Sequence, residues 1–254
     1  NKSKTMNNII YNKSNAIAHI KLNRPEVLNA FNEAMLHELK AALEDAEKDA
    51  AIKLVLVSGE GRAFSAGVDL KATDASGFQK GGSFMEVGME VGNLFTQLSK
   101  VTIAQVHGYC FTGALEMMLF FDMAFCTEDT QFGDTHTKWA VMPRWGMSQR
   151  LARRVGLNKA KELTFRAMRI KGIEAERIGL VNRAFKSEVL EAEVQKIIDE
   201  ILGNSFEAIA AIKKLYNQGY ETTLKEGLLI EYNADTDLQS TSENLSDFQN
   251  KKFQ

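Results

Sequence analysis

Short apolar strands alternate with helical segments up to about residue 147, and this alternation restricts the fold more than any other feature. Segments 53–59 (KLVLVSG), 102–108 (TIAQVHG) and 122–127 (DMAFCT) have the length and apolar character of buried strands. Residues 32–49 form the pattern of an amphipathic helix, with Asn32 placed to cap its first turn. Such alternation is typical of βαβ units, so we expect an α/β fold with a largely parallel sheet.

The two ends of the chain differ in pattern. Near the N-terminus, residues 15–23 alternate like a half-buried strand, and NIIYN before them resembles its hairpin partner. A glycine-rich segment at 77–92 overlaps the start of a helical segment at 91–100. The later part of the chain is helical in pattern at 147–154, 158–168, 188–202, 206–217 and 222–239, with one strand-like interruption at 180–185. We therefore expect an α/β core over residues 1–195 and a helical region over 196–254.

Composition excludes several classes of protein. The 254 residues are 44% hydrophobic and 25% charged, with a formal net charge of −2, which disfavours a nucleic-acid-binding protein. No run approaches the roughly 18 apolar residues of a membrane span, and the first residues lack the apolar core of a signal peptide. Cys110 and Cys126 both lie in apolar segments and form no CxxC pair. We expect them to be buried thiols of a cytoplasmic protein without a structural metal.

Two glycine-containing loops follow predicted strands. In GRAFSAGVDLKA (61–72), Ser65, Ala66 and Gly67 leave little side-chain bulk around the backbone, so a ligand can approach main-chain N–H groups. In HGYCFTGALE (107–116), a helix is expected to begin near Gly113, where unpaired N–H groups and the positive end of the helix dipole lie. Two backbone donors on neighbouring loops are the parts of an oxyanion hole, although the first loop alone could equally be an ordinary tight turn.

Glu116 is the one carboxylate in an otherwise apolar segment (107–121). Burying an ionised carboxyl group is costly unless something compensates it. Apolar surroundings favour the neutral form, which suits general acid–base catalysis near neutral pH. The alternative is a structural acid paired with an arginine or with backbone donors.

Five blocks, in this order and spacing, resemble the crotonase (enoyl-CoA hydratase/isomerase) family: NRPEVLNAFN, GRAFSAGVDLKA, HGYCFTGALEMMLFFDMAF, TQFGDTHTKWAVMPRWGMSQRLARRVG and AERIGLVNRAF. The resemblance implies a crotonase-like ββα spiral core with a helical C-terminal trimerisation region. It also implies an acyl-CoA thioester substrate, a homotrimer or homohexamer, and no metal or redox cofactor, since CoA enters as part of the substrate.

The same resemblance implies roles for individual residues. The backbone N–H groups of Val68 and Gly113 would stabilise the enolate of the thioester, and Glu116 would be a catalytic carboxylate. The residues expected to bind the CoA portion of the substrate are Arg24, Val27, Ala66, Asp69, Leu70 and Lys71.

The chain departs from the hydratase pattern after QFG. Asp134, Thr135 and His136 replace the usual Gln-Pro-Glu, so His136 occupies the position of the second catalytic glutamate. Histidine can exchange a proton near neutral pH, and Asp134 could orient its imidazole. Arg144 and Trp145 replace small residues next to the expected acyl pocket, which favours a short, polar or unusually shaped acyl group unless both side chains point away.

These residues favour an enzyme that adds water to a 2-enoyl-CoA, with Glu116 and His136 as the catalytic pair. An enoyl-CoA isomerase could work with Glu116 alone, and hydrolases and decarboxylases share the fold. A CoA-ester binding or assembly protein without activity also remains open. The dehalogenase branch is disfavoured, because Arg144 stands where its nucleophilic aspartate is expected.

Overall fold

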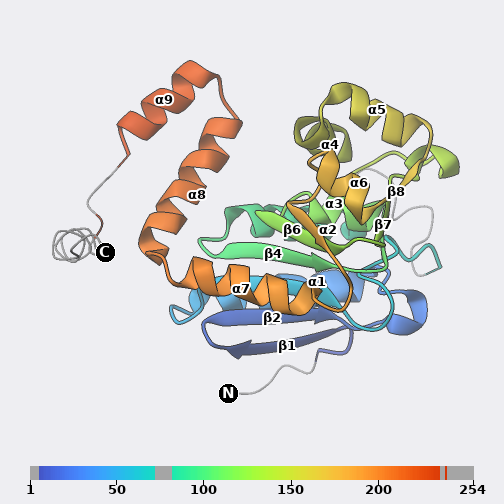
Figure 1. Cartoon of the computed structure of the whole chain (residues 1–254), viewed down its shortest axis with the longest axis horizontal. Helices are drawn as coiled ribbons and strands as arrows, with labels where there is room; N and C mark the ends of the chain where they lie inside the picture. The colour runs from blue at the N-terminus through green and yellow to red at the C-terminus, as the bar shows by residue number, and fades with distance from the viewer. Residues whose placement is uncertain (1–5, 72–81, 235–237, 239–254) are drawn as a thin grey trace. The chain divides into compact units, whose positions relative to one another are not determined.

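The computed structural model describes residues 6–71, 82–234 and 238 (Figure 1). Its main sheet has the order β1-β2-β3-β4-β6-β9. The β1–β2 pair is antiparallel and the other pairings are parallel, as the sequence pattern predicts. The strands are β1 (Ile9–Ser14), β2 (Ile17–Leu22), β3 (Leu54–Gly59), β4 (Val101–Val106), β6 (Met123–Thr127) and β9 (Arg183–Phe185).

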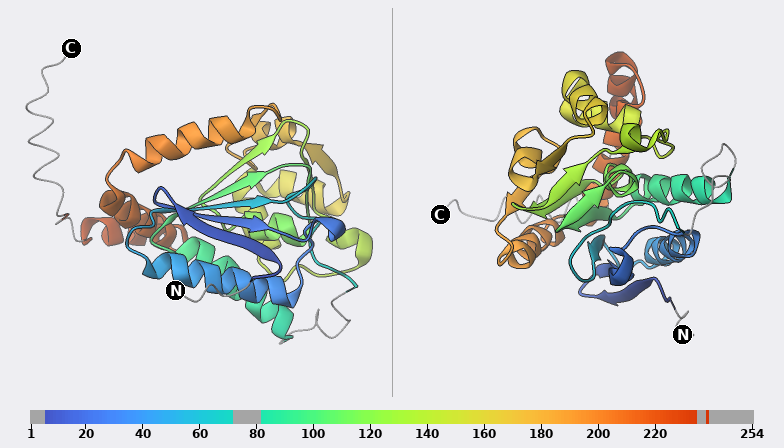
Figure 2. Two further views of the ribbon diagram at one scale, coloured as in Figure 1. Left: turned by 90° about the horizontal axis from the view of Figure 1, so that it is seen from below. Right: turned by 90° about the vertical axis from the view of Figure 1, so that its right-hand side faces the viewer.

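Helix α1 (Glu33–Lys48) forms where the sequence predicts it. The side chain of Asn32 accepts a hydrogen bond from the amide of Met35, which satisfies one of the free N–H groups at the helix start. The apolar stripe of the helix, which includes Leu39 and Ala42, is fully buried. Helix α2 (Ser83–Gln97) packs against α1 on the same side of the sheet (Figure 2).

The glycine-rich segment 77–92 is helical from Ser83, where α2 begins. Residues 72–81 lie outside the described part of the chain. Gly88 and Gly92 lie inside the helix, where a Cβ atom would overlap the rings of Trp145 and Phe120 respectively. Glycine is required here for close packing rather than for a turn, which a one-dimensional pattern does not distinguish.

A small second sheet, β5 (Tyr109–Phe111), β7 (Gln131–Gly133) and β8 (Arg169–Lys171), positions the candidate site. Strands β5 and β7 are parallel, so the residues that follow them emerge side by side. A single bridge between Ser65 and Cys110 holds the loop after β3 against β5. Three segments distant in sequence therefore meet at one edge: 65–68, 112–116 and 134–136.

The chain after residue 147 is mostly helical, as predicted; β9 lies within the predicted interruption at 180–185, and β8 is a further strand at 169–171. The additional elements are η1 (Pro25–Val27), α3 (Gly113–Met118), η2 (His136–Trp139), α4 (Met147–Val155), α5 (Leu157–Phe165), α6 (Gly172–Arg177), α7 (Leu190–Leu202), α8 (Phe206–Tyr220) and α9 (Leu224–Tyr232). By internal contacts the chain divides into units 1–197 and 198–254. Within the described residues, no helix has the length and apolar character needed to cross a membrane.

Candidate active site

The two glycine-containing loops come into direct backbone contact. Gly67 has a φ of +103°, and a Cβ atom there would lie 2.7 Å from the carbonyl oxygen of Phe111 and 3.4 Å from the amide nitrogen of Gly113. The next residue, Val68, lines the same pocket as Gly113. Within residues 6–71, 82–234 and 238, neither the amide of Val68 nor that of Gly113 has an acceptor. Both N–H groups are thus available to a ligand oxygen.

Glu116 lies one helical turn beyond Gly113 on α3, and it is only 3% exposed. Its Oε1 atom accepts hydrogen bonds from the amides of Trp145 (2.9 Å) and Met147 (3.2 Å). Met147 is the first residue of α4, so the positive end of that helix also faces the carboxylate. These donors compensate the burial of Glu116 through one of its two oxygens.

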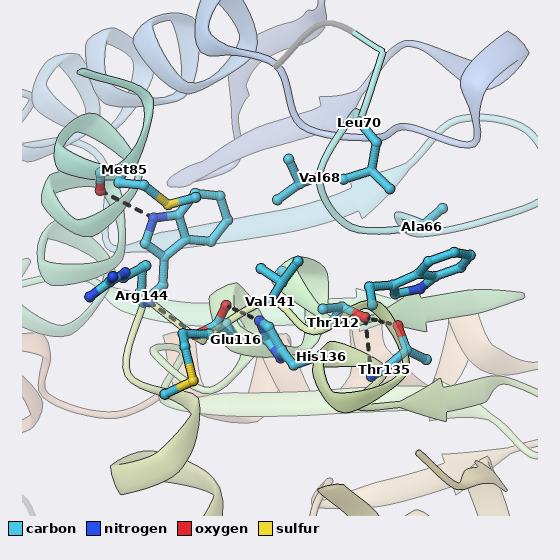
Figure 3. A pocket seen from close by; sticks show the side chains of 14 residues that line it. Ala66, Val68, Leu70, Met85, Thr112, Glu116, Thr135, His136, Val141 and Arg144 are labelled. Atoms are coloured by element: carbon cyan, nitrogen blue, oxygen red, sulfur yellow. Dashed lines mark hydrogen bonds and ion pairs between the residues drawn. The ribbon is translucent and has the colours of Figure 1, made fainter. Parts of the chain in front are cut away.

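The other oxygen of Glu116 faces His136 (Figure 3). Oε2 lies 3.3 Å from Nε2 of His136, and Nδ1 of the same ring lies 2.6 Å from Oδ1 of Asp134. The second oxygen of Asp134 accepts a hydrogen bond from the hydroxyl of Thr164 at 2.6 Å. Asp134, His136 and Glu116 thus form a buried carboxylate–imidazole–carboxylate chain.

This arrangement favours the protonated imidazole. Burial opposes the charge on the ring, but the hydrogen bonds to Asp134 and Glu116 outweigh it and raise the pKa of His136 to about 9. Burial likewise opposes the charge on Asp134, yet the hydrogen bonds from His136 and Thr164 lower the pKa of that carboxyl overall. His136 therefore carries a proton at neutral pH that it can donate.

The pocket at this site contains about 600 Å³ of empty space, part of it open to solvent. Figure 3 shows Glu116 and His136 on one wall, with Ala66, Val68 and Leu70 on the opposite wall. The lining residues are Ala66, Val68, Leu70, Met85, Thr112, Gly113, Glu116, Thr135, His136, Trp139, Val141, Met142, Arg144 and Trp145. Both residues after Pro143 thus contribute to the pocket, although the side chain of Arg144 is largely exposed.

Several predicted site residues lie elsewhere. Asp134 lies behind His136 rather than at the pocket surface. The Arg24 guanidinium donates to the carbonyl of Ala30 at 2.7 Å and pairs with Asp69 at 2.9 Å. In the described part of the chain, the pocket is not lined by Arg24, Val27, Asp69 or Lys71.

Sequence reasoning missed other residues of the site. Thr164 orients Asp134 from α5, thirty positions away, and no local pattern in the sequence connects the two. Trp139, Val141 and Met142 line the pocket from the segment that follows η2. Their proximity to QFGDTH was an available signal, since that block already carried His136.

A buried carboxylate and imidazole on the wall of a pocket, beside two free backbone amides, are the groups that acid–base catalysis requires. A family model described as enoyl-CoA hydratase/isomerase matches residues 12–252. The chain is 31% identical over 239 residues to a short-chain-enoyl-CoA hydratase of Clostridium acetobutylicum, covering 94% of this chain and 92% of that protein. It is 33% identical over 228 residues to a crotonyl-CoA hydratase of Syntrophomonas wolfei, covering 89% and 88% of the two chains.

Solved structures agree with these sequence matches. The crystal structure of an enoyl-CoA hydratase from Bacillus anthracis superimposes with a TM-score of 0.87 at 29% identity, covering 95% of both chains. The chain belongs to the enoyl-CoA hydratase/isomerase family, and the crotonase-like α/β fold expected from its sequence is confirmed.

Proposed function

We propose that this protein is an enoyl-CoA hydratase that adds water across the double bond of a short 2-enoyl-CoA. Family membership and relatives named short-chain-enoyl-CoA and crotonyl-CoA hydratases support this function. The observation that carries the proposal is the contact between Glu116 and His136 in the pocket, which supplies both an acid and a base. An isomerase needs only one protic group, so the second group favours hydration.

The amides of Val68 and Gly113 would bind the thioester oxygen of the substrate. Attack of water at C3 of the enoyl group moves electrons onto this oxygen and forms an enolate. Fixed N–H donors stabilise such charge, and removing one donor in a well-studied hydrolase costs about 2.7–4 kcal/mol. The free state of both amides supports this role.

Glu116 and His136 would divide the proton transfers. Glu116, as a carboxylate, takes a proton from water while the oxygen bonds to C3. Protonated His136 gives its Nε2 proton to C2 of the enolate. The products are a 3-hydroxyacyl-CoA, neutral Glu116 and neutral His136. Because Oε2 and Nε2 lie 3.3 Å apart, the proton can then pass from Glu116 to His136 and restore the starting state.

Ala66 and Leu70 line the pocket beside the proposed amide pair, and we place the start of the CoA moiety against them. Arg24, Val27, Asp69 and Lys71 remain proposed CoA-binding residues outside the pocket itself. The free, buried thiols of Cys110 and Cys126 suit a reducing compartment, in support of a cytoplasmic location.

We also propose a homotrimer or a dimer of trimers. Large apolar side chains are exposed on α8 and α9, including Tyr216 at 76%, Leu224 at 81% and Tyr232 at 86%. Exposed apolar surface of this extent is typical of an interaction surface. Light scattering on the purified protein tests this proposal, and a monomeric mass would contradict it.

The activity is tested by adding the protein to crotonyl-CoA and following the absorbance of the conjugated enoyl thioester. Hydration removes this absorbance and yields 3-hydroxybutyryl-CoA. A parallel reaction with 3-butenoyl-CoA detects isomerisation as a rise in the same absorbance. Isomerisation without hydration would overturn the proposal in favour of an isomerase, and tight binding without either change would indicate a non-catalytic binding protein.

A further inference from the structure

Trp145 is held by hydrogen bonds from both its backbone amide and its ring, next to the proposed reaction centre. Its backbone amide donates to Glu116 at 2.9 Å, and its ring Nε1 donates to the carbonyl of Met85 on α2 at 3.2 Å. The residue is only 1% exposed although it lines the pocket. The ring therefore cannot rotate away from the pocket without losing this part-buried hydrogen bond.

Packing confirms that the ring fills the space between α2 and the start of α3. A Cβ atom at Gly88 would overlap the ring, so α2 comes as close to the indole as a helix can. On the other side, a Cβ atom at Gly113 would lie 3.2 Å from Cζ3 of the same ring. Phe84 packs on the ring with a centroid distance of 5.4 Å, and Phe31 meets it edge-on at 6.2 Å.

We propose that Trp145 closes the far end of the acyl pocket and limits the substrate to acyl groups of about four carbons. This inference rests on the proposed function. With the thioester oxygen on the amides of Val68 and Gly113, C2 and C3 lie beside Glu116 and His136. Carbons beyond C4 then meet the indole, which is packed against Gly113 on one side and Gly88 on the other.

A closed and an open acyl pocket differ in how binding affinity changes with the length of the acyl chain. In an open apolar pocket each further methylene group tightens binding by about fourfold. Against a fixed indole, added carbons gain nothing and displace packed side chains. Affinity should therefore be greatest for a four-carbon chain and fall for longer ones.

The test is calorimetric titration with saturated butyryl-, hexanoyl-, octanoyl- and decanoyl-CoA, which bind without turnover. For the wild type we expect octanoyl-CoA to bind at least tenfold more weakly than butyryl-CoA. Trp145→Ala should reverse this order, whereas Trp145→Phe, which keeps most of the bulk, should retain it. Affinity of the wild type that rises steadily with chain length, or an unchanged profile in folded Trp145→Ala, would overturn the proposal.

A second pair of variants keeps the tryptophan in place. Gly88→Ala pushes the ring towards Gly113 and should weaken butyryl-CoA binding. Gly92→Ala, in the same helix, places a Cβ atom 2.6 Å from the ring of Phe120 instead and should not weaken it. Equal effects of the two variants would contradict a role for Trp145. If no acyl-CoA binds the wild type, the proposed function itself fails, whereas binding that is indifferent to chain length rejects only this inference.

Discussion

The two carboxylate oxygens of Glu116 have different partners. Oε1 accepts hydrogen bonds from the amides of Trp145 and Met147, whereas Oε2 lies 3.3 Å from Nε2 of His136. The first oxygen fixes the side chain in place. The second lies beside the imidazole of His136, which also lines the pocket. One oxygen is thus a structural acceptor and the other faces the pocket, so the structural and the catalytic interpretations of Glu116 do not exclude each other.

Replacing this carboxylate tests its proposed role directly. Glu116→Gln retains an oxygen that can accept from both amides, so the fold should persist. It removes the base, and we expect kcat for crotonyl-CoA hydration to fall by about 10²–10⁴-fold. Glu200→Gln, an exposed carboxylate on α7, is the control and should keep full activity. Wild-type turnover in folded Glu116→Gln would remove Glu116 from the mechanism.

The alkaline limit of activity should report the proton on His136. Below its pKa of about 9 the imidazole is charged and can donate to the substrate, and above it this ability is lost. Asp134→Asn removes one of the two charges that hold the proton, so the limit should move to lower pH by about 1–3 units. A pH–rate profile of kcat/KM measures this shift.

Thr164→Val should have a smaller effect than Asp134→Asn on the pH dependence of kcat/KM. It removes the hydrogen bond to Oδ2 of Asp134 but leaves both carboxylates of the chain in place. The alkaline limit should therefore move less than in Asp134→Asn. Coincident profiles for the wild type and both variants would show that His136 is not the acid.

The two loops of the candidate site could be predicted from the sequence, because each directly follows a predicted strand. Gly113 and Glu116 lie a few residues past a predicted strand, whereas only the family resemblance singled out Val68 within its loop. The contact between Glu116 and His136 could not be derived from residue patterns, since it depends on the parallel pairing of β5 with β7. Only the family resemblance indicated that the two positions meet.

The partners of the Arg24 side chain could not be predicted from the sequence. The resemblance assigned it to CoA binding, and its charge on a loop is consistent with such a role. The structure gives its guanidinium two intramolecular partners, Ala30 and Asp69. Whether a charged side chain faces a ligand or its own chain depends on distant residues, here forty-five positions away, which no local pattern contains.

Contact between the two amide-bearing loops predicts a severe effect of a single methyl group. Gly67→Ala places a Cβ atom 2.7 Å from the carbonyl of Phe111 and must separate the loops. Val68 is the residue after Gly67, and Gly113 lies two residues after Phe111, so the spacing of their amides would change. We expect kcat to fall by about 10²–10³-fold. Gly156→Ala is the matched control: its φ is +84°, yet nothing lies within 4 Å.

Both glycine variants carry a backbone penalty of about 1–3 kcal/mol, because both positions have a positive φ that a residue with a Cβ atom rarely adopts. Only Gly67→Ala should lose activity, measured as crotonyl-CoA hydration at a temperature where both variants are folded. Equal losses of activity in the two variants would mean that general destabilisation, and not loop separation, is responsible.

The last prediction separates the two possible roles of Arg24. If the residue acts by holding Asp69 and the carbonyl of Ala30, Arg24→Met should lower the free energy of unfolding by about 1.5–3 kcal/mol. It should also weaken the binding of crotonyl-CoA and of crotonyl-pantetheine, which lacks the nucleotide, by the same factor. Asp69→Asn should reproduce this pattern, because it breaks the same ion pair. A direct contact with the CoA phosphates predicts instead that Arg24→Met weakens only crotonyl-CoA binding and that Asp69→Asn does not follow it. Calorimetric titration with both thioesters, together with urea unfolding of each variant, distinguishes these outcomes.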